Sequence, residues 1–328
     1  MTFEFGKAHV QHQREFISLD YDKMKEIANY YLINGDLNGL LALSNYSQIL
    51  VAELISESGF PERAILSMER DPEAAVKLYR QVRWKLNERS RSLFKRLIAK
   101  IVIKISSGDS RGFSVNSREY SGAYSPGMEF DLERTIERMM ERCKKVDEMR
   151  YEDIVASDRR KRDKSLIIIL DSSGSMTGKK ILLAMMIAAI ASHKLRGGRY
   201  GVVGFNSTAF VIKSPMENKN SVKVIEEILD LVPIGYTNIS DGLKKGLEIS
   251  YNLKNPKYLL ITDGEYNVGE DPRKVARRFK NLCVIHTRGR RDSRGSALCK
   301  EIARIGGSKY FVIDDIRQIQ RVMRSILG

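Results

Sequence analysis

The C-terminal half of this chain alternates short apolar strands with helical segments, and this alternation limits the folds it can adopt. Five apolar residues, Leu166–Leu170, precede a long helical pattern, and a second apolar run, "YLLIT", follows at Tyr258–Thr262. Strands that are apolar along their whole length are buried on both faces. Strands that alternate with helices form a mostly parallel sheet covered on both sides. We therefore predict an α/β fold with a doubly wound, mostly parallel sheet.

The elements of this half are expected between residues 164 and 328. The expected strands are Leu166–Leu170, Tyr200–Phe205, Ala209–Ile212, Tyr258–Thr262, Leu282–His286 and Tyr310–Ile313. The expected helices are about Lys179–Leu195, Ser221–Val232, Ile239–Tyr251, Pro272–Lys280, Ser296–Ile305 and Ile316–Ile326. In folds of this kind, ligands bind beyond the carboxyl ends of the parallel strands.

The preceding part of the chain has a different pattern. Residues 1–107 carry apolar side chains at helical spacing, with continuous helical patterns at residues 21–33, 38–59 and 72–105, and predict an all-α domain. A Ser- and Gly-rich stretch and the amphipathic segment "EFDLERTIERMMERCKKVDEMR" fill residues 108–163, which we interpret as a loop and a linking helix. The chain is thus divided into a helical domain, a linking region and an α/β domain at residues 164–328.

Composition narrows the class of protein. The N-terminal residues lack the basic and apolar regions of a signal peptide. The longest apolar run, Ile181–Ala191, is too short to span a bilayer and is typical of a buried helix. The 3 cysteines are widely spaced and odd in number, which fits a reducing environment. We expect an intracellular, cytoplasmic protein.

Positive charge is concentrated in the second half. Residues 1–150 carry 24 Lys and Arg against 22 Asp and Glu, whereas residues 151–328 carry 32 against 19. This excess makes an acidic partner plausible for the C-terminal half, although it equally fits a solvated basic surface.

The stretch "DSSGS" directly follows the first apolar strand and places small oxygen-bearing side chains at the strand end. Asp171, Ser173 and Ser175 are spaced so that a carboxylate and two hydroxyls can converge on one point. Hard oxygen ligands of this kind suit a Mg²⁺-like cation. Further oxygens are available from Thr237 in "GYTN" and Asp263 in "LLITDG". Two carboxylates just neutralise a divalent cation, which leaves an open position for a carboxylate from outside.

These three motifs, in this order, resemble the metal-ion-dependent adhesion site (MIDAS) of the von Willebrand factor type A (VWA) domain. The resemblance covers about residues 164–328 and matches at Asp171, Ser173, Ser175, Thr237 and Asp263. It implies a doubly wound sheet, a bound Mg²⁺ or Mn²⁺, and a site that accepts an acidic group of a partner protein. It implies no catalytic residues, and we expect a protein that is not an enzyme.

The segment "YSPGMEFDLERTIERMM" at residues 124–140 resembles the element that precedes the VWA domain in CoxE- and ViaA-like proteins. Those proteins share the layout of a helical N-terminal region followed by a VWA domain. They work with MoxR-type AAA+ ATPases in chaperone-like assembly. The resemblance implies such an ATPase, or its client, as the partner; the alternative is a simple amphipathic helix.

Two alternatives concern the "DSSGS" region. Asp171 and Ser173 could simply cap the following helix, as Asp and Ser often do. The stretch Gly174–Lys180 also resembles a phosphate-binding loop, but it has three residues between its glycines instead of four, and Lys180 stands where the motif needs a Ser or Thr after its lysine. An aspartyl phosphotransferase would need a second acid at the position of Ser173.

The loop "HTRGRRDSRG" follows a later strand and is expected at the same sheet edge as the metal site. We predict that Arg288, Arg290, Arg291 and Arg294 surround the ligand entrance and pair with acidic groups of the partner. The alternative is nucleic-acid binding by this basic surface. The loop lacks interleaved aromatic residues for base stacking.

Overall fold

The computed structural model describes residues 20–107, 121–123, 129–130, 132–142, 149–150, 153–157, 165–195, 199–288, 294–315 and 317–327. They fall into two compact units. The first contains the N-terminal helices and the sheet domain through Ile319, and the second contains the residues between these parts together with the chain from Gln320 onward. No helix among the described residues is long and apolar enough to cross a membrane.

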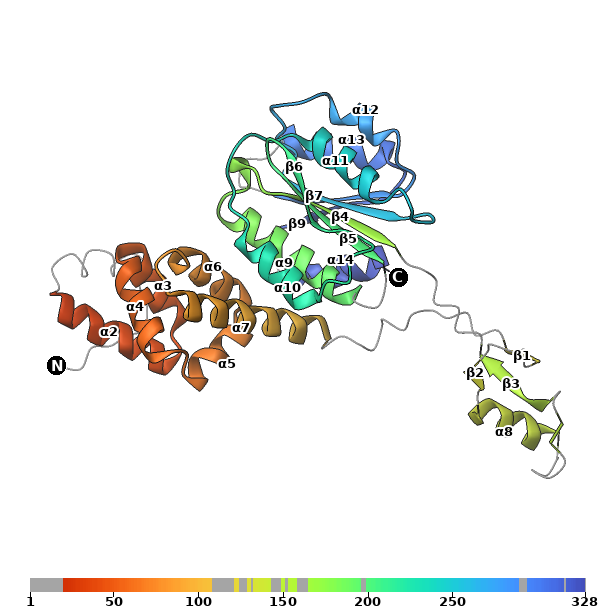
Figure 1. Ribbon diagram of the computed structural model, residues 1–328, viewed down its shortest axis with the longest axis horizontal. Helices are drawn as coiled ribbons and strands as arrows, with labels where there is room; N and C mark the ends of the chain where they lie inside the picture. The colour runs from red at the N-terminus through yellow and green to blue at the C-terminus, as the bar shows by residue number, and fades with distance from the viewer. Residues whose placement is uncertain are drawn as a thin grey trace. The chain divides into compact units, whose positions relative to one another are not determined.

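A six-stranded sheet forms the centre of the C-terminal half, as predicted (Figure 1). Its strands are β4 (Leu166–Asp171), β5 (Tyr200–Phe205), β6 (Ala209–Lys213), β7 (Lys257–Thr262), β8 (Leu282–Thr287) and β9 (Tyr310–Ile313). The spatial order is β6-β5-β4-β7-β8-β9, and only the edge strand β6 is antiparallel to its neighbour. Strand β4 thus lies in the middle, with β5 on one side and β7 on the other.

Helices cover both faces of this sheet (Figure 1). They are α9 (Lys179–Lys194), α10 (Ser221–Asp230), α11 (Ile239–Ile249), α12 (Pro272–Ala276) and α13 (Arg294–Ile305). Helix α14 (Arg317–Leu327) follows β9 in the sequence. On one face, α11, α12 and α13 pack on a core that contains Ile167, Phe205 and Leu260. Leu166–Leu170 in β4 and Tyr258–Thr262 in β7 are buried throughout, which confirms the expectation drawn from their continuous apolar pattern. Strands β5 and β8 are also buried along their full length.

Helix α9 lies on the other face and is buried on all sides. Every residue from Ile181 to His193 is buried, because the sheet contacts one side of the helix while α7 and α10 contact other sides. A helix that is apolar all round is expected to be buried in this way. The apolar run that is too short for a membrane span is therefore the central helix of the fold.

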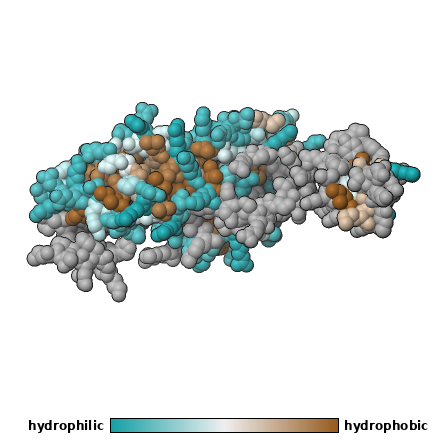
Figure 2. Space-filling view, turned by 90° about the horizontal axis from the view of Figure 1, so that it is seen from below, coloured by the Kyte–Doolittle hydropathy of each residue, from teal (hydrophilic) through white to brown (hydrophobic). Residues whose placement is uncertain are grey.

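The described part of the N-terminal region, from residue 20 onward, contains the helices α2 (Tyr21–Asn34), α3 (Leu37–Tyr46), α4 (Gln48–Ser58), α5 (Glu62–Arg70), α6 (Pro72–Val82) and α7 (Glu88–Ser107). Two helical patterns that looked continuous are broken. The Ser47 hydroxyl accepts from the Leu50 amide, and Asn87 Oδ1 accepts from the Ser90 amide, so each starts a new helix. Hydrophobic residues lie between hydrophilic ones on the surface of these helices (Figure 2). The side chains of Trp84 and Leu93 are exposed.

The second unit contains strands that we did not predict. They are β1 (Ser121–Ala123), β2 (Glu129–Phe130) and β3 (Val155–Ser157), in the antiparallel order β1-β3-β2, and α8 (Leu132–Glu141) lies between β2 and β3 in the sequence. Each strand has only two or three residues, too few for a recognisable alternation. Asp153 is fully buried and accepts hydrogen bonds from Arg142 Nη1 at 2.7 Å and from the Arg150 amide at 3.1 Å.

Candidate metal centre

The "DSSGS" stretch leaves the centre of the sheet at the carboxyl end of β4. Asp171 is the last residue of that strand, and the Ser172 amide and hydroxyl both donate to the carbonyl of Phe205 at the end of β5. A short 3₁₀ turn, η5 (Gly174–Met176), follows. Gly178, at φ 66°, then redirects the chain into α9. This left-handed conformation favours glycine.

The capping alternative is wrong. The residue before α9 is Gly178, and no side chain caps this helix. Ser173 precedes η5 but makes no capping hydrogen bond either. Instead, Asp171 Oδ1 accepts from the Ser173 amide at 2.9 Å and from its hydroxyl at 2.6 Å. The oxygens are thus directed toward one another rather than toward the helix.

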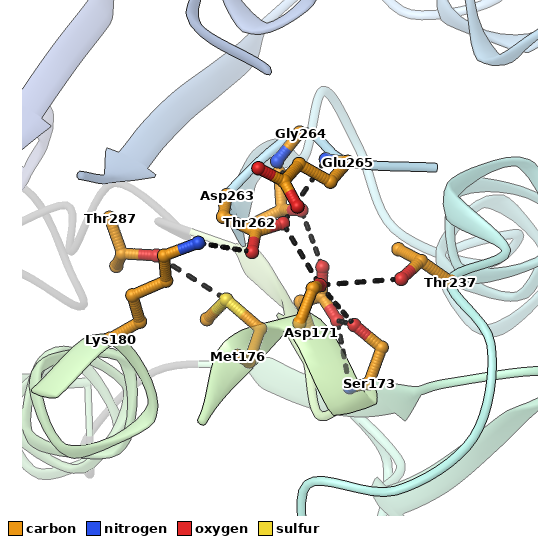
Figure 3. A network of polar contacts seen from close by, with 11 residues as sticks. Asp171, Ser173, Met176, Lys180, Thr237, Thr262, Asp263, Gly264, Glu265 and Thr287 are labelled. Carbon is orange, nitrogen blue, oxygen red and sulfur yellow. Dashed lines mark hydrogen bonds and ion pairs between the residues drawn. The ribbon is translucent and has the colours of Figure 1, made fainter. Parts of the chain in front are cut away.

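Three loops bring the five predicted side chains together, and Figure 3 shows Asp171, Ser173, Thr237 and Asp263 among them. Ser175 Oγ lies 3.1 Å from Ser173 Oγ, 3.5 Å from Thr237 Oγ1 and 3.3 Å from Asp263 Oδ1. Thr237 comes from the turn before α11, and Asp263 follows β7. Ser175 is therefore the centre of a cluster in which two carboxylates and three hydroxyls converge.

Backbone contacts hold these loops in place. The Gly174 amide donates to the carbonyl of Gly235, which joins the β4 loop to the turn that carries Thr237. The Thr237 amide donates to Asn267 Oδ1 at 2.8 Å, which joins that turn to the loop after β7. Gly264 adopts φ 77°, and a Cβ there would collide with the carbonyl oxygen of Gly295, so Asp263 must be followed by glycine.

Two further residues belong to this cluster and were not predicted as part of it. Thr262 Oγ1 donates to Asp171 Oδ2 at 2.5 Å and accepts from the Gly264 amide at 3.0 Å. Lys180 Nζ lies 2.8 Å from Asp263 Oδ2. Thr262 directly precedes Asp263 in the sequence, and this position next to a predicted ligand could have indicated that Thr262 belongs to the cluster. Lys180 was considered only as the residue that replaces the Ser or Thr of a phosphate-binding loop, and its contact with Asp263 has no local sequence signal.

The electrostatics of the cluster favour a bound cation. Asp171 and Asp263 are both fully buried. Burial, and to a smaller extent the neighbouring Asp263, raise the pKa of Asp171 to about 7, while hydrogen bonds from Ser173 and Thr262 oppose the shift. Among the described residues, no group of three or more His, Cys, Asp or Glu side chains gathers. The two carboxylates and three hydroxyls are a hard-oxygen donor set, which fits Mg²⁺ or Mn²⁺.

The structure tests only part of the predicted arginine surface. Arg288 is exposed directly after β8, and the preceding Thr287 hydroxyl lies 3.4 Å from Met176 Sδ in η5, so this loop starts beside the oxygen cluster. Arg290 and Arg291 lie outside the described residues, as does the side chain of Arg294 at the start of α13. Their role at the entrance stays a prediction.

The fold and the site together define a VWA-type domain. The chain belongs to the family of VWA domain containing CoxE-like proteins, whose model matches residues 113–292, just over half of the chain. This match includes the segment that resembles the element before the CoxE-type domain. Members of this family are in general interaction modules rather than enzymes.

Similarity to individual proteins is weaker. The chain is 25% identical over 192 residues to the uncharacterized protein YfbK of Escherichia coli, which covers 53% of this chain but only a third of that relative. A von Willebrand factor type A structure from Catenulispora acidiphila is 20% identical with a TM-score of 0.43, and covers 53% of this chain and 43% of that one. Proximal thread matrix protein 1 from the mussel byssus, with a zinc-occupied MIDAS motif, is 21% identical with a TM-score of 0.41 and covers 50% and 47%.

Proposed function

We propose that this chain is a non-enzymatic interaction protein that holds Mg²⁺ at Asp171, Ser173, Ser175, Thr237 and Asp263. The observation that carries the proposal is the convergence of these five side chains from three separate loops around Ser175. Their oxygens would hold the cation, which supplies a Lewis-acidic position for an external carboxylate. The buried acids Asp171 and Asp263 would supply the negative charge that retains it.

The partner proposed for this site is a protein that presents an acidic residue. Membership of the CoxE-like family supports a MoxR-type AAA+ ATPase, or a client of such an ATPase, in chaperone-like assembly. The arginine side chains of residues 288–294 would pair with further acidic groups around the central carboxylate.

An affinity capture from native lysate tests this function. The baits are wild type in Mg²⁺, wild type in EDTA, and D171A in Mg²⁺, each with and without nuclease. D230N is the matched control because Asp230 lies on α10, outside the oxygen cluster. We expect an ATPase or its client with wild type and D230N in Mg²⁺ only, unaffected by nuclease.

Nucleic-acid binding is the second candidate, and the basic excess of residues 151–328 favours it. If nucleic acid is captured equally in Mg²⁺, in EDTA and with D171A, the basic surface is the functional one. The adhesion-site proposal would then be wrong.

A further inference from the structure

Lys180 brings a positive charge to the oxygen cluster. It lies in the first turn of α9, two residues after Gly178, and its side chain is 17% exposed. Its ammonium lies 2.8 Å from Asp263 Oδ2, and Asp263 is fully buried (Figure 3). Ion pairs at buried carboxylates are screened little by solvent. Lys180 therefore acts on the site at short range.

The two oxygens of Asp263 have different neighbours. Oδ1 accepts from the Ser175 hydroxyl at 3.3 Å and from the Glu265 amide at 3.1 Å, so it belongs to the oxygen cluster. Oδ2 is held by Lys180. The carboxylate of Asp263 thus turns one oxygen, Oδ1, toward the proposed cation position and the other, Oδ2, toward the ammonium group of Lys180. Lys180 orients Asp263 and withdraws part of its negative charge from the cluster.

This lysine changes the charge balance of the site. Asp171 and Asp263 alone would neutralise a divalent cation. With Lys180 included, the loaded site carries a net positive charge. The positive charge of Lys180 disfavours binding of the cation, because the two charges are alike. The net positive charge of the loaded site favours binding of an incoming carboxylate.

We propose that Lys180 is a positioning residue that sets the charge of the loaded site, lowering its affinity for the cation and raising its affinity for an anionic partner group. The inference rests on the proposed function, because it concerns the same metal centre. A purely structural lysine would not shift the two affinities in opposite directions.

The test uses the full chain and Mn²⁺ as the probe. Mn²⁺ affinity is measured by calorimetry for wild type, K180M, K180R, K179M and D171A. K179M is the matched control, since Lys179 is an exposed neighbour in the same helical turn. Acetate binding to each Mn²⁺-loaded protein is then followed by water-proton relaxation, which falls when a bound water is displaced.

We expect K180M to bind Mn²⁺ about tenfold more tightly than wild type and acetate several-fold more weakly, given the short distance to Asp263. K180R and K179M should resemble wild type. Thermal melting checks that each variant folds, and K180Q replaces K180M if the latter does not. Unchanged or weaker Mn²⁺ binding by the folded neutral variant overturns the inference about Lys180. Wild-type Mn²⁺ affinity in D171A would instead overturn the metal centre itself.

Discussion

Two sites with acidic side chains in the first unit, one built on a single Asp and one on two, differ in how their charge is balanced. At the end of α10, Asp230 accepts from the Tyr79 hydroxyl at 2.6 Å and from Lys95 Nζ at 2.8 Å, and its side chain is 44% exposed. At the end of β4, the fully buried Asp171 and Asp263 face each other, and the one ion pair that the described residues show there is made by Lys180.

This difference in charge balance indicates that the Asp230 site is structural and that the site at the end of β4 is a candidate functional site. Asp230 is matched by one lysine and one hydroxyl, and the cluster joins α6 and α7 to α10. Arg83 adds a hydrogen bond from Nη1 to the carbonyl of Leu229 at 3.0 Å. The cluster at β4 buries more negative charge than its partners neutralise. Such an imbalance costs free energy unless a cation binds, and unbalanced buried charge often marks functional sites.

The largest expected effect is the loss of cation-dependent stability on removing Asp171. A ligand at a hundredfold excess over its Kd stabilises the folded state by about 2.7 kcal/mol. Wild type should therefore melt at a higher temperature in Mg²⁺ than in EDTA, whereas D171A should melt at one temperature in both. Differential scanning calorimetry measures the two transitions. D230N should keep the wild-type response; loss of the response in D230N would contradict the separation of the two clusters.

Removing Asp230 should destabilise the fold without affecting the cation response. D230A leaves the fully buried Tyr79 hydroxyl without its acceptor, at a cost of about 1–3 kcal/mol. Urea unfolding measures this change, and it can be followed by the fluorescence of Trp84 because the chain has a single tryptophan. E227A on the same helix is the control, because it breaks a half-exposed pair with Lys219, and should cost less than about 1 kcal/mol. Equal losses in the two variants would show that Asp230 is not structural.

The third prediction concerns pH in the absence of divalent cations. The pKa of Asp171 is about 7 in the fold and lies above its ordinary value of 3.8, so the fold favours the protonated acid. This contribution to stability is complete below the ordinary pKa and is lost as pH rises through about 7. In EDTA, the free energy of unfolding of wild type should fall by about 2 kcal/mol between pH 5.5 and 8.5, relative to D171N.

Urea titrations at both pH values measure that difference. Because D171N lacks the titrating group, subtracting its profile removes the contributions of other residues. A wild-type profile parallel to that of D171N would mean that the acid at the end of β4 is already ionised without penalty. The contrast with Asp230 would then disappear.

Much of the sheet domain could be predicted because its signals are local. The strands Tyr200–Phe205 and Tyr310–Ile313 have the predicted bounds, and the others differ by one residue at an end. Helix α12 ends at Ala276 rather than Lys280. In the N-terminal region, periodicity predicted helices but not where they break. A capping side chain such as Ser47 is also compatible with a helix interior, and packing decides between the two.

The sequence by itself determined the order of strands and helices and the five oxygen-bearing residues, since hydrophobic periodicity and short motifs depend on neighbours along the chain. Only the tertiary structure decided that Lys180 pairs with Asp263, 83 residues away, and that Tyr79 pairs with Asp230, 151 residues away. Such pairs depend on the spatial order of the strands and on which helix faces meet. For that reason, the charge balance of each acidic cluster cannot be read from any local pattern.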